Sequence, residues 1–279
     1  MPHTLFFDGF AGAAGDMLIG AMLDAGVDRS AWEAELARLA LPKGSYAYRI
    51  DRVSKLGIQA TKFTVMLGDR EADSDLYELL EDGPGHQNHG HEHHPHEGHQ
   101  HDHAPHEHRG LLEIEGILDR SPIAAPARDL AKRIFRNLAI AEGTVHGQPP
   151  EAVHFHEVGA IDAIVDITGF AIAHHLMGAD RVVVSPIAVG SGLIRCAHGI
   201  MPVPVPAVVE LLKAAGAPLR ASDLKGEWLT PTGAAILTTI ADTYAPMVAF
   251  QKLTASGFGA GKRDHEAVPN VVRLLVGIE

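Results

Sequence analysis

The chain has 279 residues, of which 46% are hydrophobic and 21% charged, a composition typical of a globular protein with one large domain or two smaller ones. A formal net charge of −12 with neutral histidines argues against a nucleic-acid-binding protein, because phosphate recognition needs concentrated Lys and Arg. The single cysteine, Cys196, excludes an intramolecular disulfide. No basic leader and no apolar run of about 18–20 residues is present, so we expect a cytoplasmic protein that is not embedded in a membrane.

The first 70 residues predict the start of an α/β domain. Apolar residues at 5–7 indicate a strand, and a glycine-rich turn leads into predicted helices at 17–25 and 31–39. Alternating polarity over 45–67 predicts an antiparallel hairpin that turns near Lys55.

Residues 71–108 are first acidic and then rich in His, Gly and Pro, which predicts a disordered insertion because such a segment buries little apolar surface. The α/β domain resumes over 109–279. Continuous apolar strands between helices favour a mixed, largely parallel sheet flanked by helices. The expected elements are structure at 111–118, helices at 126–142, 160–177, 203–215 and 232–241, and strands at 182–184 and 271–276.

Eleven of the nineteen histidines fall within this insertion, interleaved with acidic residues. Imidazole suits nickel, zinc, copper and iron, and closely spaced histidines in a flexible chain can wrap an ion without a preformed pocket. The pattern indicates capture or storage of a transition metal, although an exposed low-complexity segment with incidental affinity is the alternative. The eleven are His86, His89, His91, His93, His94, His96, His99, His101, His103, His106 and His108.

A second group of candidate ligands precedes the predicted helix at 160–177. In an extended chain His154 and His156 point to the same side, and Glu157 and Asp162 add carboxylates at a helix start, where the dipole favours them. These four residues could form the shell of a reactive metal. Alternatively, the two acids cap the helix and the histidines are ordinary surface groups.

The turn after the first strand could hold an anion. Gly9, Gly12 and Gly15 expose backbone N–H groups at a helix N-terminus, and the flanking Asp8 and Asp16 suit an anion that is bridged by a divalent cation. Glycines needed only for the turn are an equally good explanation.

Later segments offer similar groups, and the cations after 257–261 could hold a negative charge. A glycine hairpin at 257–263 and an N-cap at Thr230 are the simple alternatives. The candidates for binding an anionic group are Gly190, Ser191, Gly192, Thr230, Thr232, Gly233, Gly259, Gly261, Lys262 and Arg263, with His198 as a further metal candidate.

Taken in order, these segments resemble the LarC family of nickel insertion proteins. The similarity runs from residue 7 to about residue 277, and the motifs are specific as a set. They are FDGFAGAAGDM at 7–17, the histidine-rich insertion, HFHEVGAIDAIVD at 154–166, GSG at 190–192, CAHG at 196–199, TPTG at 230–233 and GFGAG at 257–261.

The resemblance implies a cyclometallase that inserts nickel into pyridinium-3,5-bisthiocarboxylic acid mononucleotide by forming carbon–nickel and sulfur–nickel bonds. It implies CTP with manganese or magnesium as a requirement, and the other lactate racemase maturation proteins as partners. We expect His154, His156, Glu157 and Asp162 to carry the reaction, the glycine segments to hold the phosphate of the substrate, and the histidine-rich insertion to collect nickel.

Family members commonly continue through a C-terminal domain that binds CTP. We expect this domain to be absent from the chain and to be supplied by a separate partner, with a homo-oligomer as the other expectation. A nickel storage or delivery chaperone without catalysis is the main alternative function. A zinc or manganese hydrolase built on His154, His156 and an acid is a third.

Overall fold

The computed structural model describes residues 2–72, 78–79, 109–155, 160–196 and 198–279. A mixed sheet with the strand order β13-β6-β1-β15-β14-β3-β2 forms its centre, and β4 pairs with β3 at one side. Its strands are β1 (His3–Asp8), β2 (Ala47–Lys55), β3 (Ile58–Leu67), β4 (Arg70–Glu71), β6 (Arg181–Val184), β13 (Thr243–Tyr244), β14 (Lys252–Ala260) and β15 (Val271–Ile278).

The sheet combines both strand directions, as predicted. The pairs β13–β6, β6–β1 and β14–β3 are parallel, whereas β1–β15, β15–β14 and β3–β2 are antiparallel. The predicted hairpin is confirmed, with its turn at Leu56 and Gly57.

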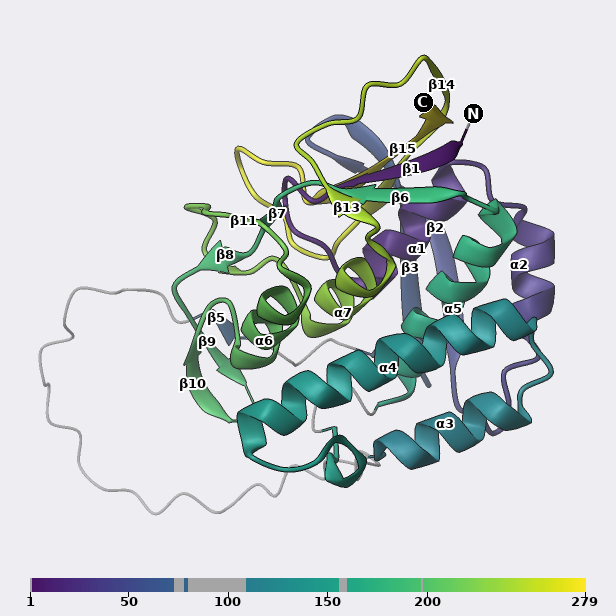
Figure 1. Cartoon of the computed structure of the whole chain (residues 1–279), viewed down its shortest axis with the longest axis vertical. Coiled ribbons are helices and arrows are strands. Elements are labelled where there is room, and N and C mark those ends of the chain that lie inside the picture. The colour runs from purple at the N-terminus through teal and green to yellow at the C-terminus, as the bar shows by residue number, and fades with distance from the viewer. Residues whose placement is uncertain (1, 73–77, 80–108, 156–159, 197) are drawn as a thin grey trace, which may run out of the picture.

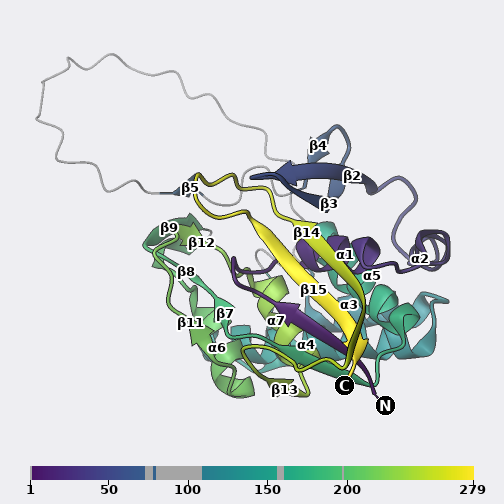
Figure 2. The same cartoon turned by 90° about the horizontal axis from the view of Figure 1, so that it is seen from above.

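Helices lie against this sheet in layers, which Figures 1 and 2 show from two directions. In the inner layer α1 packs on β14 and β3, beside α5, and α4 lies across α5 and α7 on the outer side. The mixed sheet flanked by helices is therefore confirmed. The helices are α1 (Gly15–Asp24), α2 (Arg29–Leu36), α3 (Leu111–Arg120), α4 (Ala125–His146), α5 (Ile161–Met177), α6 (Pro206–Ala215) and α7 (Pro231–Ile240), with a short 3-10 helix at Pro150–Ala152.

Alternation along β1 divides the core between the two faces of the sheet. Leu5 and Phe7 join the main cluster under the helices, whereas Phe6 joins a smaller cluster with Val248 and Leu275. Successive strand residues point to opposite faces. The strand is thus buried on both sides, and its last residue, Asp8, lies at the C-terminal end of this central strand, next to the loop that leads to α1.

Strand β14 was not predicted, because Gly257 and Gly259 indicated a turn. The structure explains these glycines by the closeness of α1. A Cβ built on Gly259 would lie 1.7 Å from the carbonyl oxygen of Met17, and one on Gly257 would lie 2.2 Å from that of Ala21. Only a strand without side chains at these positions lets the helix backbone approach so closely. Residues 257–260 are therefore strand rather than turn, and the chain reverses over 261–270, between β14 and β15.

Two further boundaries differ from the sequence expectations. Glu78–Leu79 forms strand β5 inside the stretch predicted as an insertion, because its backbone pairs with β9 (Leu193–Cys196). Residues 203–205 precede α6 rather than joining it, since the helix begins at Pro206, a favoured first position for proline. The small sheets also contain β7 (Ile187–Ala188), β8 (Gly190–Ser191), β10 (Gly199–Pro202), β11 (Leu219–Arg220) and β12 (Gly226–Glu227).

Within the described ranges, the helices are all too short or too polar to cross a bilayer.

Candidate functional site

The loop between β1 and α1 is held by backbone contacts with the segment before α7. Ala13 N donates to Trp228 O at 2.9 Å, and Thr230 N donates to Ala13 O at 3.1 Å. Gly12 has φ +80°, and a Cβ there would lie 1.9 Å from Trp228 O. Two of the glycine-containing segments singled out in the sequence are therefore neighbours in space.

The segment at 190–192 joins the same assembly through β8, which pairs with β12. Trp228 N donates to Val189 O at 3.3 Å, directly before β8. The hydroxyl of Ser191 donates to Leu224 O at 3.1 Å. Residues 9–15, 190–192 and 228–233 thus form one group of loops.

Thr230 caps α7, as the simpler interpretation of the sequence predicted. Its Oγ1 accepts a hydrogen bond from Gly233 N at 3.2 Å and lies 2.9 Å from the hydroxyl of Thr232. Side-chain capping of this kind satisfies an N–H group that the helix leaves without a partner. Whether these residues also bind an anionic group stays a prediction.

Three aspartates lie at the start of α1 and in the first turns of α5. They line one small cavity of about 10 Å³, which is room for about one water-sized particle. The lining residues are Asp16, Thr64, Val65, Asp162, Asp166 and Lys262. The predicted candidates Asp16, Asp162 and Lys262 are therefore brought together by α1, α5 and the segment after β14.

Asp162 and Asp166 stand one turn apart on α5 and are 8% and 9% exposed. Gly15 lies directly against the second of them, since a Cβ on Gly15 would be 2.9 Å from the Asp166 side chain. The N-cap of α5 is Ala160, without a side-chain hydrogen bond, so the alternative that Asp162 caps the helix is wrong. Sequence reasoning assigned no role to Asp166, although the i, i+4 spacing places both acids on one helix face.

The backbone at Lys262 is held by a residue of β2, a strand that only β3 separates from β14 in the sheet. Lys55, the last residue of β2, donates through Nζ to the carbonyl oxygens of Lys262 and Arg263 at 3.3 and 3.0 Å, and to Asp264 Oδ1 at 2.7 Å. The hydrogen bond from Lys55 holds the pKa of the Asp264 carboxyl below its usual value, and the lysine charge adds to this. Asn270 also donates to Arg263 O. This lysine, which sequence reasoning missed as a site residue, therefore fixes the segment that carries Lys262.

Two other predicted residues lie apart from the acidic cavity. Asp8 pairs with Arg273, whose Nη2 is 2.6 Å from Asp8 Oδ2, and it is not among the lining residues. His154 is exposed and forms an isolated bridge with Gly110, so it does not line the cavity with Asp162. His156, Glu157 and the eleven histidines at 86–108 lie outside the described residues.

His198 is exposed at the turn between β9 and β10 and packs on His146, with ring centroids 5.0 Å apart. Among residues 2–72, 78–79, 109–155, 160–196 and 198–279, no three or more His, Cys, Asp or Glu side chains are grouped so that they could hold a metal ion. The described residues thus supply an acidic cavity and loop amides rather than a complete metal centre.

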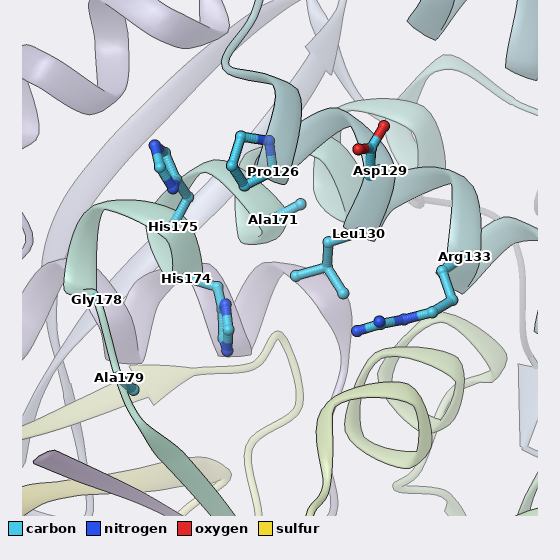
Figure 3. A pocket seen from close by; sticks show the side chains of 9 residues that line it. All are labelled: Pro126, Asp129, Leu130, Arg133, Ala171, His174, His175, Gly178 and Ala179. Carbon is cyan, nitrogen blue, oxygen red and sulfur yellow. The ribbon is translucent and has the colours of Figure 1, made fainter. Parts of the chain in front are cut away.

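A larger cavity of about 330 Å³ lies near the other end of α5, against α4. Figure 3 shows Arg133 extending toward His174, with Leu130 between them. Burial lowers the pKa of the His174 imidazole from its usual value, and the charge of Arg133 adds to this. Because the cavity lies at the end of α5 away from Asp162, we regard it as separate from the acidic cavity.

The fold and the site define an α/β protein in which buried carboxylates, a lysine and glycine-rich loops gather where the first strand meets its helix. A sequence model described as nickel insertion protein matches residues 5–279. The chain belongs to the nickel insertion protein family.

Its relatives include proteins named pyridinium-3,5-bisthiocarboxylic acid mononucleotide nickel insertion protein. Those of Geobacillus kaustophilus (strain HTA426) and Nocardioides sp. (strain ATCC BAA-499 / JS614) are each 40% identical over 275 residues, which cover 99% of this chain and 60% of the relative. The one of Acetivibrio thermocellus is 38% identical over 277 residues, again 99% and 60%. The chain therefore spans about 60% of the length of these relatives, and no solved structure matches it.

Proposed function

We propose that this chain takes part in the insertion of nickel into pyridinium-3,5-bisthiocarboxylic acid mononucleotide, the compound in its relatives' names. The product is the nickel pincer cofactor of lactate racemase, and the reaction is a cyclometallation that depends on CTP. Membership of the family supports the nickel chemistry. The observation that carries the proposal is the acidic cavity, where Asp162 and Asp166 face a region that also contains Lys262.

The chemistry of the substrate gives these groups a role. Thiocarboxylates at ring positions 3 and 5 would bind nickel beside ring carbon 4. When a carbon–nickel bond forms at that carbon, its carbon–hydrogen bond breaks and the proton passes to a base. Asp162 or Asp166 serves as this base, and Lys262 offers positive charge to the anionic substrate. The cavity admits only a water-sized group, so the mononucleotide lies outside it, along the glycine-containing loops. The proton therefore reaches the carboxylate through one water in the cavity.

The binding of CTP with manganese or magnesium belongs to a C-terminal portion of the whole protein in this proposal. The chain spans about 60% of the relatives' length, and we assign none of its described residues to CTP. That portion belongs to the same polypeptide, is a separate partner protein, or is supplied by another copy in a homo-oligomer. Other lactate racemase maturation proteins are the partners in this proposal, and the racemase receives the product.

The decisive experiment combines the chain and its C-terminal portion with the thiocarboxylated mononucleotide, nickel, CTP and manganese, and detects the nickel product by mass spectrometry. We expect Asp166→Asn and Asp162→Asn to lower the rate of product formation by about 10²-fold or more, the usual effect of removing a general base. Asp51→Asn is the matched control, because its carboxylate is 52% exposed on β2. Wild-type rates in both cavity variants would refute the assigned role of the cavity.

A storage or delivery chaperone is the second candidate, favoured by the eleven histidines at 86–108. Deleting 85–108 separates collection from chemistry. If this segment feeds nickel to the reaction, the deletion variant forms product at saturating nickel and fails when nickel is scarce. Absence of product with and without the C-terminal portion, together with tight nickel binding, would favour the chaperone.

A further inference from the structure

Two histidines from distant parts of the chain meet away from the acidic cavity. His146 is the last residue of α4, and His198 lies at the turn between β9 and β10. Their ring centroids are 5.0 Å apart and the ring planes are inclined by 36°. His198 is exposed and the His146 side chain is 26% exposed, so an ion from solution can reach them.

The separation of the rings suits two ligands of one ion. An imidazole nitrogen binds a first-row ion such as zinc at about 2.0–2.1 Å, which puts each ring centre about 3.2 Å from the metal. Bond angles between about 90° and 109°, as in octahedral and tetrahedral sites, then place two ring centres about 4.5–5.2 Å apart. The observed 5.0 Å lies within this interval.

The surroundings of His146 favour a bound cation. Glu142 stands one turn earlier on α4, and its Oε2 is 3.6 Å from His146 Nε2. Carboxylates beside a ligating histidine orient the ring and increase its basicity. The C-terminal end of α4, where His146 lies, also carries the negative end of the helix dipole.

We propose that His146 and His198 form a two-histidine site for a first-row divalent ion of the nickel, copper and zinc class, with water as the remaining ligands and Glu142 as a positioning residue. Two protein ligands leave coordination positions open, so the ion can be passed on. This agrees with the absence of a three-ligand group among the described residues. Binding by the pair does not depend on the proposed function; only the choice of nickel as the physiological ion rests on it.

Residue-resolved chemical modification tests the pair in the complete chain, without interference from the histidines at 86–108. Diethyl pyrocarbonate modifies histidines that are not bound to metal, and mass spectrometry of peptides reports each one separately. As nickel is added in excess, we expect His146 and His198 to become protected together, with one shared half-saturating concentration.

Substitution of either histidine should uncouple the other. We expect His146→Ala to raise the nickel concentration that half-protects His198 by more than about tenfold, and His198→Ala to do the same for His146, as weakening a metal shell commonly costs 10–100-fold in affinity. Glu142→Gln should raise it for both by about tenfold. His175→Ala, at an exposed histidine of α5, is the matched control and should change nothing.

The proposal is overturned if His198 stays equally protected in His146→Ala, because the ion then binds elsewhere. It is also overturned if neither histidine of the wild-type chain is protected at millimolar nickel, because the rings then only pack together. The two single variants alter different elements. If one of them misfolds, the protection measured in the other still tests the proposal. Nickel insertion can fail while this protection persists, which separates the inference from the proposed function.

Discussion

Replacing Gly259 with alanine is expected to destabilise the whole domain, because the new methyl group meets the backbone of α1. The Cβ would lie 1.7 Å from Met17 O and 2.6 Å from Ala21 N, whereas ordinary contacts begin at 3.4 Å. Both neighbours belong to the helix backbone rather than to the ends of flexible side chains. The conflict is relieved only if α1 and β14 move apart.

The cost of this movement follows from what α1 buries. Leu18, Ile19 and Met22 are fully buried in the main cluster, and an outward gap of 0.5–1 Å already forfeits about a quarter to a half of each contact's attraction. Overpacking a core forces side chains and backbone to shift and costs about 1–3 kcal/mol, occasionally more. Because the new methyl group would lie 1.7 Å from a helix carbonyl oxygen, we expect Gly259→Ala to lie at the upper end and to lower the free energy of unfolding by about 3 kcal/mol or more.

Equilibrium unfolding in urea, followed by circular dichroism, measures this loss. Gly116→Ala is the matched control, because Gly116 lies within α3 and a Cβ there meets only the end of the Arg120 side chain, at 3.3 Å. Removing a helix-interior glycine should stabilise the protein by about 0.5–1 kcal/mol. If both variants unfold at the wild-type midpoint, the close approach of α1 to β14 does not hold in solution.

Three further predictions concern single side chains. Lys55→Met should lower the free energy of unfolding by about 1–3 kcal/mol, since two carbonyl groups lose their hydrogen-bond donor. The control is Lys252→Met, at an exposed lysine, and equal urea midpoints for the two variants would refute the prediction. Thr230→Val should lower the thermal midpoint by removing a cap worth about 0.5–2 kcal/mol, whereas Thr230→Ser keeps it; the idea fails if the two variants melt alike. Because burial lowers the folded pKa of His174, the unfolded chain takes up this proton first as pH falls below about 6.5, and stability declines. In urea titrations across this pH range, His174→Gln should lose less unfolding free energy than the wild type. The prediction is contradicted if His174→Gln and the control His175→Gln lose the same amount.

Local patterns in the sequence predicted much of the fold. The hairpin of β2 and β3 follows from alternating polarity, and α5 follows from a long apolar segment that ends at a glycine. Both signals lie within the element itself, so no knowledge of distant residues is needed. By contrast, β14 owes its glycines to a helix more than 200 residues earlier, and the local sequence indicates a turn.

The candidate site was predictable only in part, for the same reason. Asp16 and Asp162 could be singled out because each stands at the start of a predicted helix, and Lys262 because it follows a glycine series. Lys55 could not, since the carbonyl groups that it binds lie 207 and 208 residues further along the chain. The position of His154 beside Gly110, away from the cavity, likewise depends on a contact between segments that the sequence does not connect.

The position of β15 bears on how the chain reaches its folded state. This strand pairs with β1 on one side and with β14 on the other, so it joins the group β13-β6-β1 to the group β14-β3-β2. Its register sets His3 opposite Ile278, and closing so long a loop is slow compared with local pairing. A ribosome that has not yet released residues 271–278 therefore holds two separate half-sheets with exposed edges, which is the stage at which the chain is most open to aggregation and to assistance by chaperones.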